Sequence, residues 1–218
     1  MKDFEQKEVI SKYNERLKIH GDNSPKSLGW DKGNQELRFE VFLKYWEIKE
    51  NYSILDFGCG FGDFGHYLRN QNINCKYTGV DINKSLINVA KNKKLNNVNF
   101  HTIDFLKKGL GERYDLIFSS GVHNIKIDNN ISFIEETFKN FYNNSKIGFA
   151  INFMSDNANI KYDENYYSNP TKILALAYKF SKRVSLINNY MPYEFTIFID
   201  KRDIFDKNTT YAADSKKH

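Results

Sequence analysis

The sequence predicts a doubly wound α/β fold around a mostly parallel sheet. Short apolar runs alternate with amphipathic stretches from residue 53 onward, a pattern typical of parallel strands joined by helices on both faces. Three glycines, Gly58, Gly60 and Gly62, separate the first apolar run from an amphipathic stretch, which indicates strand, tight turn and helix. Only residues 189–193 separate the last two apolar runs. No crossover helix fits there, so an antiparallel hairpin is expected.

The hydrophobic pattern places each element in chain order. Helices are predicted at 3–20 and 34–49, both lying across the C-terminal edge of the sheet, and Phe4, Val9 and Tyr13 lie near one face of the first. Seven strands are predicted, at 53–57, 76–80, 98–101, 114–119, 146–153, 183–189 and 194–200. The helices between them are predicted at 63–71, 84–92, 130–143 and 170–180.

Length and composition bound the class of protein. A chain of 218 residues with 40% hydrophobic residues is long and apolar enough to fold around a substantial core. We expect one domain over 1–204, with a helical lid over 1–50, a core over 51–204 and a flexible tail over 205–218. The sequence shows neither a signal peptide nor an apolar run that could span a membrane, so a cytoplasmic protein is expected.

Charge and cysteine content disfavour some partners. Two cysteines, Cys59 and Cys75, cannot make a disulfide framework, as expected in a reducing compartment. The net charge of +5 is spread along the chain, and Lys91, Lys93 and Lys94 form the nearest approach to a cluster. They fall at a predicted helix C-terminus, where cations are favoured. A nucleic-acid partner is therefore disfavoured.

The glycine turn is suited to holding a ligand. Glycine allows positive φ and close approach to the backbone, and the helix behind the turn presents unpaired N–H groups. Asp63 stands where the dinucleotide fingerprint has its third glycine. A carboxylate there disfavours a pyrophosphate and favours a zwitterionic or cationic ligand. Without further motifs, a tight structural turn would explain the glycines equally well.

Acidic residues at the next two strand ends extend this site, because ligands of such sheets bind outside the carboxyl ends of the strands. Asp81 lies 23 residues beyond Gly58 and can accept both hydroxyls of a ribose, although it could also cap the next helix. Asp104 can accept from an exocyclic amine, and Phe105 can add its N–H and an apolar surface for adenine. A turn aspartate beside a core phenylalanine is the alternative.

These motifs, in this order, resemble the class I S-adenosylmethionine-dependent methyltransferases, which have a Rossmann-like sheet. The matching segments are 55–62, 79–82, 104–105 and 114–117, within a likeness that covers about 53–201. The resemblance implies S-adenosylmethionine as cofactor, S-adenosylhomocysteine as product, and the C-terminal hairpin. It also places Asp56 near the cofactor amino group, and a sulfonium and an ammonium would suit Asp56, Asp63 and Asp81.

Residues before the turn resemble the N-terminal lid of small-molecule methyltransferases. Tyr13, Trp30 and Arg38 are candidates for closing over the cofactor, with Arg38 on its carboxylate, although Tyr13 and Trp30 could be packing residues. The complete set of predicted cofactor-binding residues is Tyr13, Trp30, Arg38, Asp56, Gly58, Gly60, Gly62, Asp81, Ile82, Asp104, Phe105 and Ser119.

The acceptor side is less strongly specified. His123 follows the fourth strand and is the candidate general base, because imidazole titrates near neutral pH; a structural histidine is the alternative. Asn124, Tyr166 and Tyr193 are candidate substrate contacts, and no metal site is predicted.

The expected function is methyl transfer to a small polar acceptor, with oxygen favoured over nitrogen, by a monomer or homodimer. General likeness to bacterial enzymes of capsular polysaccharide synthesis suggests a sugar or phosphoramidate acceptor. The alternatives are methylation of a small amine or RNA at nitrogen, and a non-catalytic regulatory protein that binds S-adenosylmethionine.

Overall fold

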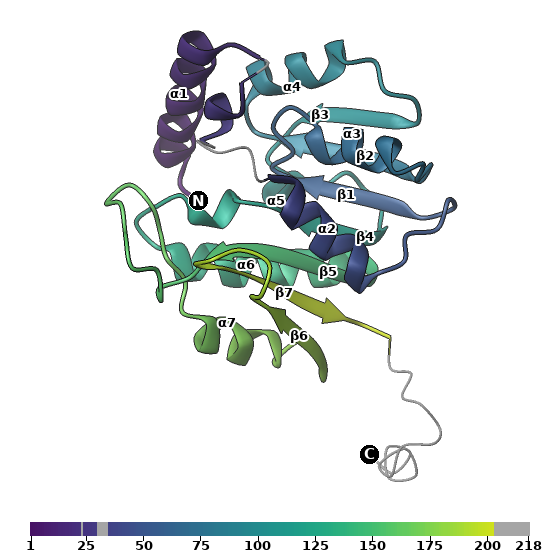
Figure 1. Ribbon diagram of the computed structural model, residues 1–218, viewed down its shortest axis with the longest axis vertical. Helices are drawn as coiled ribbons and strands as arrows, with labels where there is room; N and C mark the ends of the chain where they lie inside the picture. Colours follow the sequence, from purple (N-terminus) through teal and green to yellow (C-terminus); the bar gives the residue numbers. More distant parts are fainter. Residues whose placement is uncertain (23, 30–34, 203–218) are drawn as a thin grey trace.

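The computed structural model describes residues 1–22, 24–29 and 35–202, and seven strands in it form one sheet (Figure 1). Their order across the sheet is β3-β2-β1-β4-β5-β7-β6. The strands are β1 (Ser53–Phe57), β2 (Lys76–Asp81), β3 (Val98–Thr102), β4 (Tyr114–Ser119), β5 (Ser145–Met154), β6 (Arg183–Ile187) and β7 (Glu194–Asp200). The predicted tail over 205–218 lies outside the described residues.

The direction of the strands confirms the predicted mostly parallel sheet with an antiparallel C-terminal hairpin. Neighbouring strands from β3 through β5 run parallel. β7 runs antiparallel to both of its neighbours, β5 and β6. The last strand therefore inserts between β5 and β6, and β6 forms the edge of the sheet.

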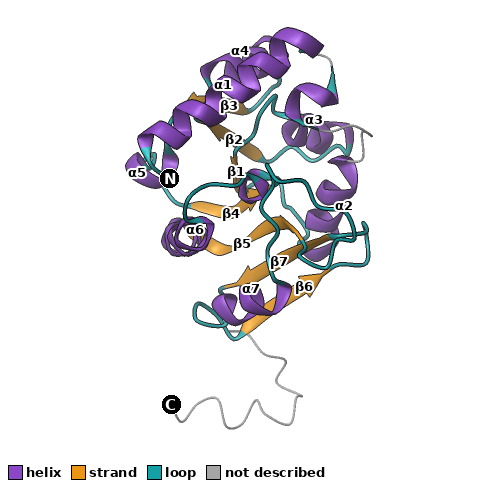
Figure 2. Cartoon of the chain, turned by 90° about the vertical axis from the view of Figure 1, so that its left-hand side faces the viewer, coloured by secondary structure: helices purple, strands orange, loops and turns teal. Residues whose placement is uncertain are grey.

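Helices cover both faces of the sheet. Figure 2 shows α2 and α3 on one side of it and α5 and α6 on the other. The helical elements are α1 (Asp3–His20), η1 (Pro25–Leu28), α2 (Gln35–Tyr45), α3 (Asp63–Asn70), α4 (Lys84–Asn92), α5 (Phe105–Lys108), η2 (Val122–Asn124), α6 (Asn130–Asn144) and α7 (Pro170–Ala177). Among the described residues, no helix is both long and apolar enough to cross a bilayer.

Alternation along the strands produces two apolar clusters, because successive side chains of a strand point to opposite faces. Ile54 and Leu116 pack in the cluster that includes residues of α2, α3 and α4. Leu55 and Ile117 pack in the cluster that includes residues of α5, α6 and α7. The sheet is thus buried on both faces, as parallel sheets require.

The placement of α2 differs from the sequence-based expectation. Its Phe42 ring lies 4.6 Å from the ring of Phe118 on β4 and 5.8 Å from that of Phe64 on α3, so α2 packs on a face of the sheet. By contrast, α1 lies across the end where the parallel strands terminate (Figure 1). Phe4 of α1 is 51% exposed, because the face turned toward the sheet carries Val9 and Tyr13 without it.

Close packing of Trp46, which follows α2, and of β7 around β5 leaves no space for a side chain at Gly148. A Cβ there would lie 2.9 Å from Cζ2 of Trp46 and would collide with the carbonyl oxygen of Ile199. Gly148→Ala is therefore expected to lower the free energy of unfolding by about 3 kcal/mol, as at overpacked sites. Urea denaturation measures this change. Gly111→Ala, whose Cβ would meet nothing within 4 Å, should cost only the strain of its positive φ, about 1 kcal/mol; equal losses would contradict the tight packing.

Candidate active site

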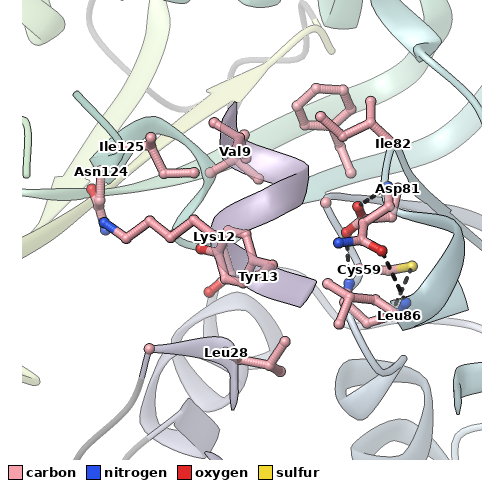
Figure 3. Close-up of a pocket in the computed structure, with 18 of the residues that line it drawn as sticks. Val9, Lys12, Tyr13, Leu28, Cys59, Asp81, Ile82, Leu86, Asn124 and Ile125 are labelled. Atoms are coloured by element: carbon pink, nitrogen blue, oxygen red, sulfur yellow. Dashed lines mark hydrogen bonds between the residues drawn. The ribbon is translucent and has the colours of Figure 1, made fainter. Parts of the chain in front are cut away.

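A cavity of about 800 Å³ opens at the C-terminal ends of the parallel strands, beneath α1 (Figure 3). The ends of β1 and β2 and the segment after β4 form its floor. From α1, the described residues that line it are Gln6, Val9, Lys12, Tyr13, Arg16 and His20. Figure 3 shows Asp81 and Ile82 on one side of the cavity and Asn124 and Ile125 on the other.

The glycine turn has the backbone that only glycine adopts readily. Gly58, Gly60 and Gly62 have φ of 74°, 53° and 71°, in the region that L side chains avoid. A Cβ on Gly58 would collide with Val122, and one on Gly62 would lie 2.5 Å from the Phe100 ring. Gly58 and Gly60 line the cavity. Gly62 is the N-cap of α3 and lies outside it.

Asp81 joins this turn to β2. Its Oδ2 accepts from the amide of Gly60 at 3.1 Å and its Oδ1 from that of Asn83 at 2.8 Å. The side chain of Asn83 accepts from the amides of Ser85 and Leu86 and caps α4, so Asp81 is not the cap. Desolvation raises the pKa of Asp81, and the amide hydrogen bonds oppose this. Each carboxylate oxygen retains a second lone pair, which can accept a ligand hydroxyl.

Asp104 lines the cavity at the end of β3, and its neighbour Phe105 does not. Oδ2 of Asp104 accepts from Nε2 of Gln6 on α1 at 2.6 Å, and Oδ1 accepts from the amide of Lys107 at 3.3 Å. The Phe105 side chain is fully buried in the core, next to Phe57. Its predicted apolar contact with a ligand is not seen, and Ile103 and Ile82 line the cavity in its place.

Asp56 and Asp63 lie outside the cavity lining. Asp56 is buried beneath the turn and accepts from the hydroxyl of Tyr77. Desolvation raises the pKa of Asp56 to about 7; the Tyr77 hydrogen bond opposes this, and the negative charges of Asp81 and Asp63 add to it. Asp63 begins α3 and forms an ion pair with Lys93 at 2.7 Å. Asp81 is therefore the one carboxylate of the expected acidic group that faces the cavity.

Arg38 and Glu194 form a buried ion pair at the cavity wall. Nε of Arg38 donates to Oε2 of Glu194 at 2.6 Å, and Nη2 donates to Oε1. Glu194 also accepts from the side-chain Nδ2 of Asn152 at 3.0 Å, and Nη1 of Arg38 lies 3.4 Å from the hydroxyl of Ser120. Arg38 lines the cavity as expected, but Glu194 of β7 holds its guanidinium.

The other predicted cofactor residues differ in position. Tyr13 lines the cavity from α1, and burial raises its pKa. Ser119 is fully buried and does not line the cavity, whereas the next residue, Ser120, does. Trp30 lies outside the described residues.

His123 is not placed where a general base would act. It is fully buried and does not line the cavity. Its Nε2 lies 3.1 Å from Oγ1 of Thr137 on α6, and its ring stacks on Phe133 at 5.2 Å. Burial lowers the pKa of His123 to about 3. A neutral imidazole packed against α6 cannot take a proton from a molecule in the cavity, so the structural alternative fits these contacts.

Of the three predicted substrate contacts, one lines the cavity. Asn124 does so from η2. Tyr193 is exposed outside the cavity, where its hydroxyl accepts from Nδ2 of Asn159 at 3.1 Å. Tyr166 packs at the edge of the core, and its amide donates to the carbonyl of Asn124 at 2.9 Å.

Lys12 and Glu194 are among the cavity residues that were not anticipated from the sequence. Lys12 lies next to Tyr13 on α1, at the border of the helix face that carries Val9 and Tyr13. The position of Lys12 beside this apolar face was the one sequence pattern that could have indicated it. Glu194 begins the strand that pairs with β5, and only the inserted position of β7 brings it to the cavity.

Comparison with known proteins identifies the family. The model of a methyltransferase domain family matches residues 48–194, and the chain belongs to that family. It is 29% identical over 158 residues to the candidate methyltransferase Rv1506c of Mycobacterium tuberculosis, covering 69% of this chain and 93% of that protein. The resemblance to class I S-adenosylmethionine-dependent methyltransferases is confirmed, and with it the enzyme class and methyl donor.

Solved structures share the fold at low sequence identity. The DhpI complex with S-adenosylhomocysteine superposes with a TM-score of 0.68 at 12% identity, covering 88% of this chain and 95% of that one. Human N-acetylserotonin methyltransferase in complex with S-adenosylmethionine gives a TM-score of 0.64 at 18% identity, covering 88% of this chain and 57% of that one.

The raised pKa of Asp56 predicts a pH-dependent stability. Between about pH 4 and pH 7 the folded protein keeps a proton on Asp56 that the unfolded chain releases. Wild-type stability should therefore fall with rising pH relative to Asp56→Asn, by about 3 kcal/mol across this window. Urea unfolding of both proteins at pH 4.5, 5.5, 6.5 and 7.5 measures the difference in stability. The contribution of His123, whose pKa is also shifted by burial, cancels in this difference because both proteins contain it. A pH-independent difference would refute the assignment.

Proposed function

We propose that this protein transfers a methyl group from S-adenosylmethionine to an oxygen atom of a small polar acceptor. The carrying observation is that one cavity joins two chemically different ends. Asp81 lines one end and Asn124 lines the other, and the glycine turn and the end of β3 adjoin Asp81 because β1 and β3 are the neighbours of β2 in the sheet. A cavity of about 800 Å³ falls within the range of small-molecule sites.

The residues at the first end fit the cofactor. We assign the ribose hydroxyls to Asp81, whose two oxygens are fixed by backbone amides and retain free lone pairs. The backbone of Gly58 and Gly60 lies open to the methionine part. Ile82 supplies an apolar wall for adenine, and Asp104 can accept from its exocyclic amine.

Positioning supplies most of the catalysis in this proposal. When bound, S-adenosylmethionine provides a methyl group on a positively charged sulfur. The chain binds and orients both reactants, and α1 lies over the cavity, which limits the access of water to them. Such positioning can contribute about 7–11 kcal/mol, whereas a general base adds about 3–5 kcal/mol. Since His123 is buried away from the cavity, the mechanism does not depend on its imidazole.

The charges around the acceptor favour oxygen over nitrogen. Lys12 lines the cavity from α1 and extends toward Asn124, and a protonated amine at that end would be repelled by this cation. Methylation of RNA is disfavoured because Lys93, in the nearest approach to a lysine cluster in the sequence, pairs with Asp63 and lies over the Phe61 ring. A capsular precursor as acceptor stays a prediction.

Asp81→Ala should weaken S-adenosylmethionine binding at least tenfold, because two charge-assisted hydrogen bonds to the ribose are lost. Isothermal titration calorimetry with the full chain measures the dissociation constant. Asp63→Ala is the matched control, because it removes a carboxylate that pairs with Lys93 outside the cavity. Unchanged affinity in Asp81→Ala, or equal loss in both variants, would overturn the ribose assignment.

A further inference from the structure

Lys12 brings a cation into the cavity without a carboxylate to neutralise it. Its side chain is half-buried and lines the cavity, and Figure 3 shows it extended across the cavity in the direction of Asn124. Within the part of the chain that the structure describes, no ion pair or hydrogen bond involves its ammonium group. A lysine ammonium can only donate hydrogen bonds.

Asn124 contributes a second donor, and its orientation is fixed by the protein. The amide of Met154 donates to Oδ1 of Asn124 at 2.7 Å. An N–H requires an acceptor, so this contact identifies the carbonyl oxygen and leaves the NH₂ group on the other side. The backbone of Asn124 is held as well, by Gly121 and Tyr166. Within the described residues, its NH₂ group has no hydrogen-bond partner.

The carboxylates that line the cavity do not pair with Lys12. Glu194 is engaged by Arg38, and Asp104 accepts from Gln6. Glu136 lies 4.0 Å from the N-terminal ammonium group. Glu164 lines the cavity but is exposed, and no ion pair joins it to Lys12 in the described structure. The end of the cavity near Asn124 therefore presents two hydrogen-bond donors, Lys12 and the NH₂ group of Asn124, without a hydrogen-bond acceptor from the described residues.

We propose that the methyl acceptor carries an oxyanion, a carboxylate or a phosphate, which Lys12 and the NH₂ group of Asn124 bind. This inference rests on the proposed methyl transfer and specifies the substrate class of the same cavity. An oxyanion offers only acceptor atoms, which match two groups that only donate. Lys12 shares α1 with Val9 and Tyr13, which line the same cavity. An anion bound to Lys12 would therefore also hold α1 in place over the cavity.

The test uses the full chain saturated with S-adenosylhomocysteine and two probes, inorganic phosphate and acetate. Titration followed by NMR of the backbone and Asn side-chain amides gives a dissociation constant for each probe. We expect saturable binding of at least one probe, with the largest shift at the Asn124 NH₂ group. The probe that binds more tightly distinguishes a phosphate from a carboxylate substrate.

Two variants test the donors individually. Lys12→Met removes the cation, and Asn124→Asp keeps an oxygen for the Met154 amide but replaces the NH₂ group with a negatively charged oxygen. Each should weaken probe binding about tenfold or more. Lys7→Met is the control, because Lys7 is exposed on the same helix and does not line the cavity, and it should bind the probes like the wild type.

S-adenosylhomocysteine affinity is measured for every protein, and it reports the donor end separately. Normal S-adenosylhomocysteine binding with no saturable probe binding, or with equal probe binding in Lys12→Met and wild type, overturns the oxyanion site and leaves the methyltransferase proposal intact. Absence of S-adenosylhomocysteine binding to the wild type would overturn the methyltransferase proposal itself.

Discussion

The hydrogen bond from the Gly60 amide to the Asp81 carboxylate is the contact on which the cavity depends. It joins the turn after β1 to the end of β2, and the amides of Gly58 and Cys59 strengthen the same connection by donating to the Val80 carbonyl. The turn reaches this position only with positive φ at its glycines. One acidic residue thereby shapes the backbone and also presents its remaining lone pairs to the cavity.

Much of the fold followed from patterns local in sequence. The glycine turn, the acid at each strand end and the five-residue link before the last strand predicted the sheet and its hairpin, because parallel strands deliver their carboxyl ends to one edge. The backbone positions of Gly58, Gly60 and Asp81 could be placed in the site for the same reason. These features depend on backbone geometry more than on side-chain packing.

What could not be predicted depends on contacts between distant segments. His123 stands in the sequence between Val122 and Asn124, which line the cavity, but its ring packs against Thr137 and Phe133 of α6. Ser119 and Ser120 exchange roles because adjacent residues near a strand end face opposite directions. Lys12 and Glu194 enter the cavity only through the docking of α1 and the insertion of β7. One-dimensional periodicity carries no information on either event.

The Arg38–Glu194 ion pair joins residues 156 positions apart in the chain, and this separation constrains the order of assembly. A buried guanidinium without its carboxylate would cost about 3–5 kcal/mol, so α2 cannot settle with Arg38 buried until β7 has been made. During synthesis from the N-terminus, the strands that present the glycine turn, Asp81 and Asp104 are complete long before Glu194 emerges. The part of the cavity wall formed by Arg38 and Glu194 is thus among the last parts of the protein to form, and a nascent chain completes the glycine turn and the ends of β2 and β3 before this part of the wall exists.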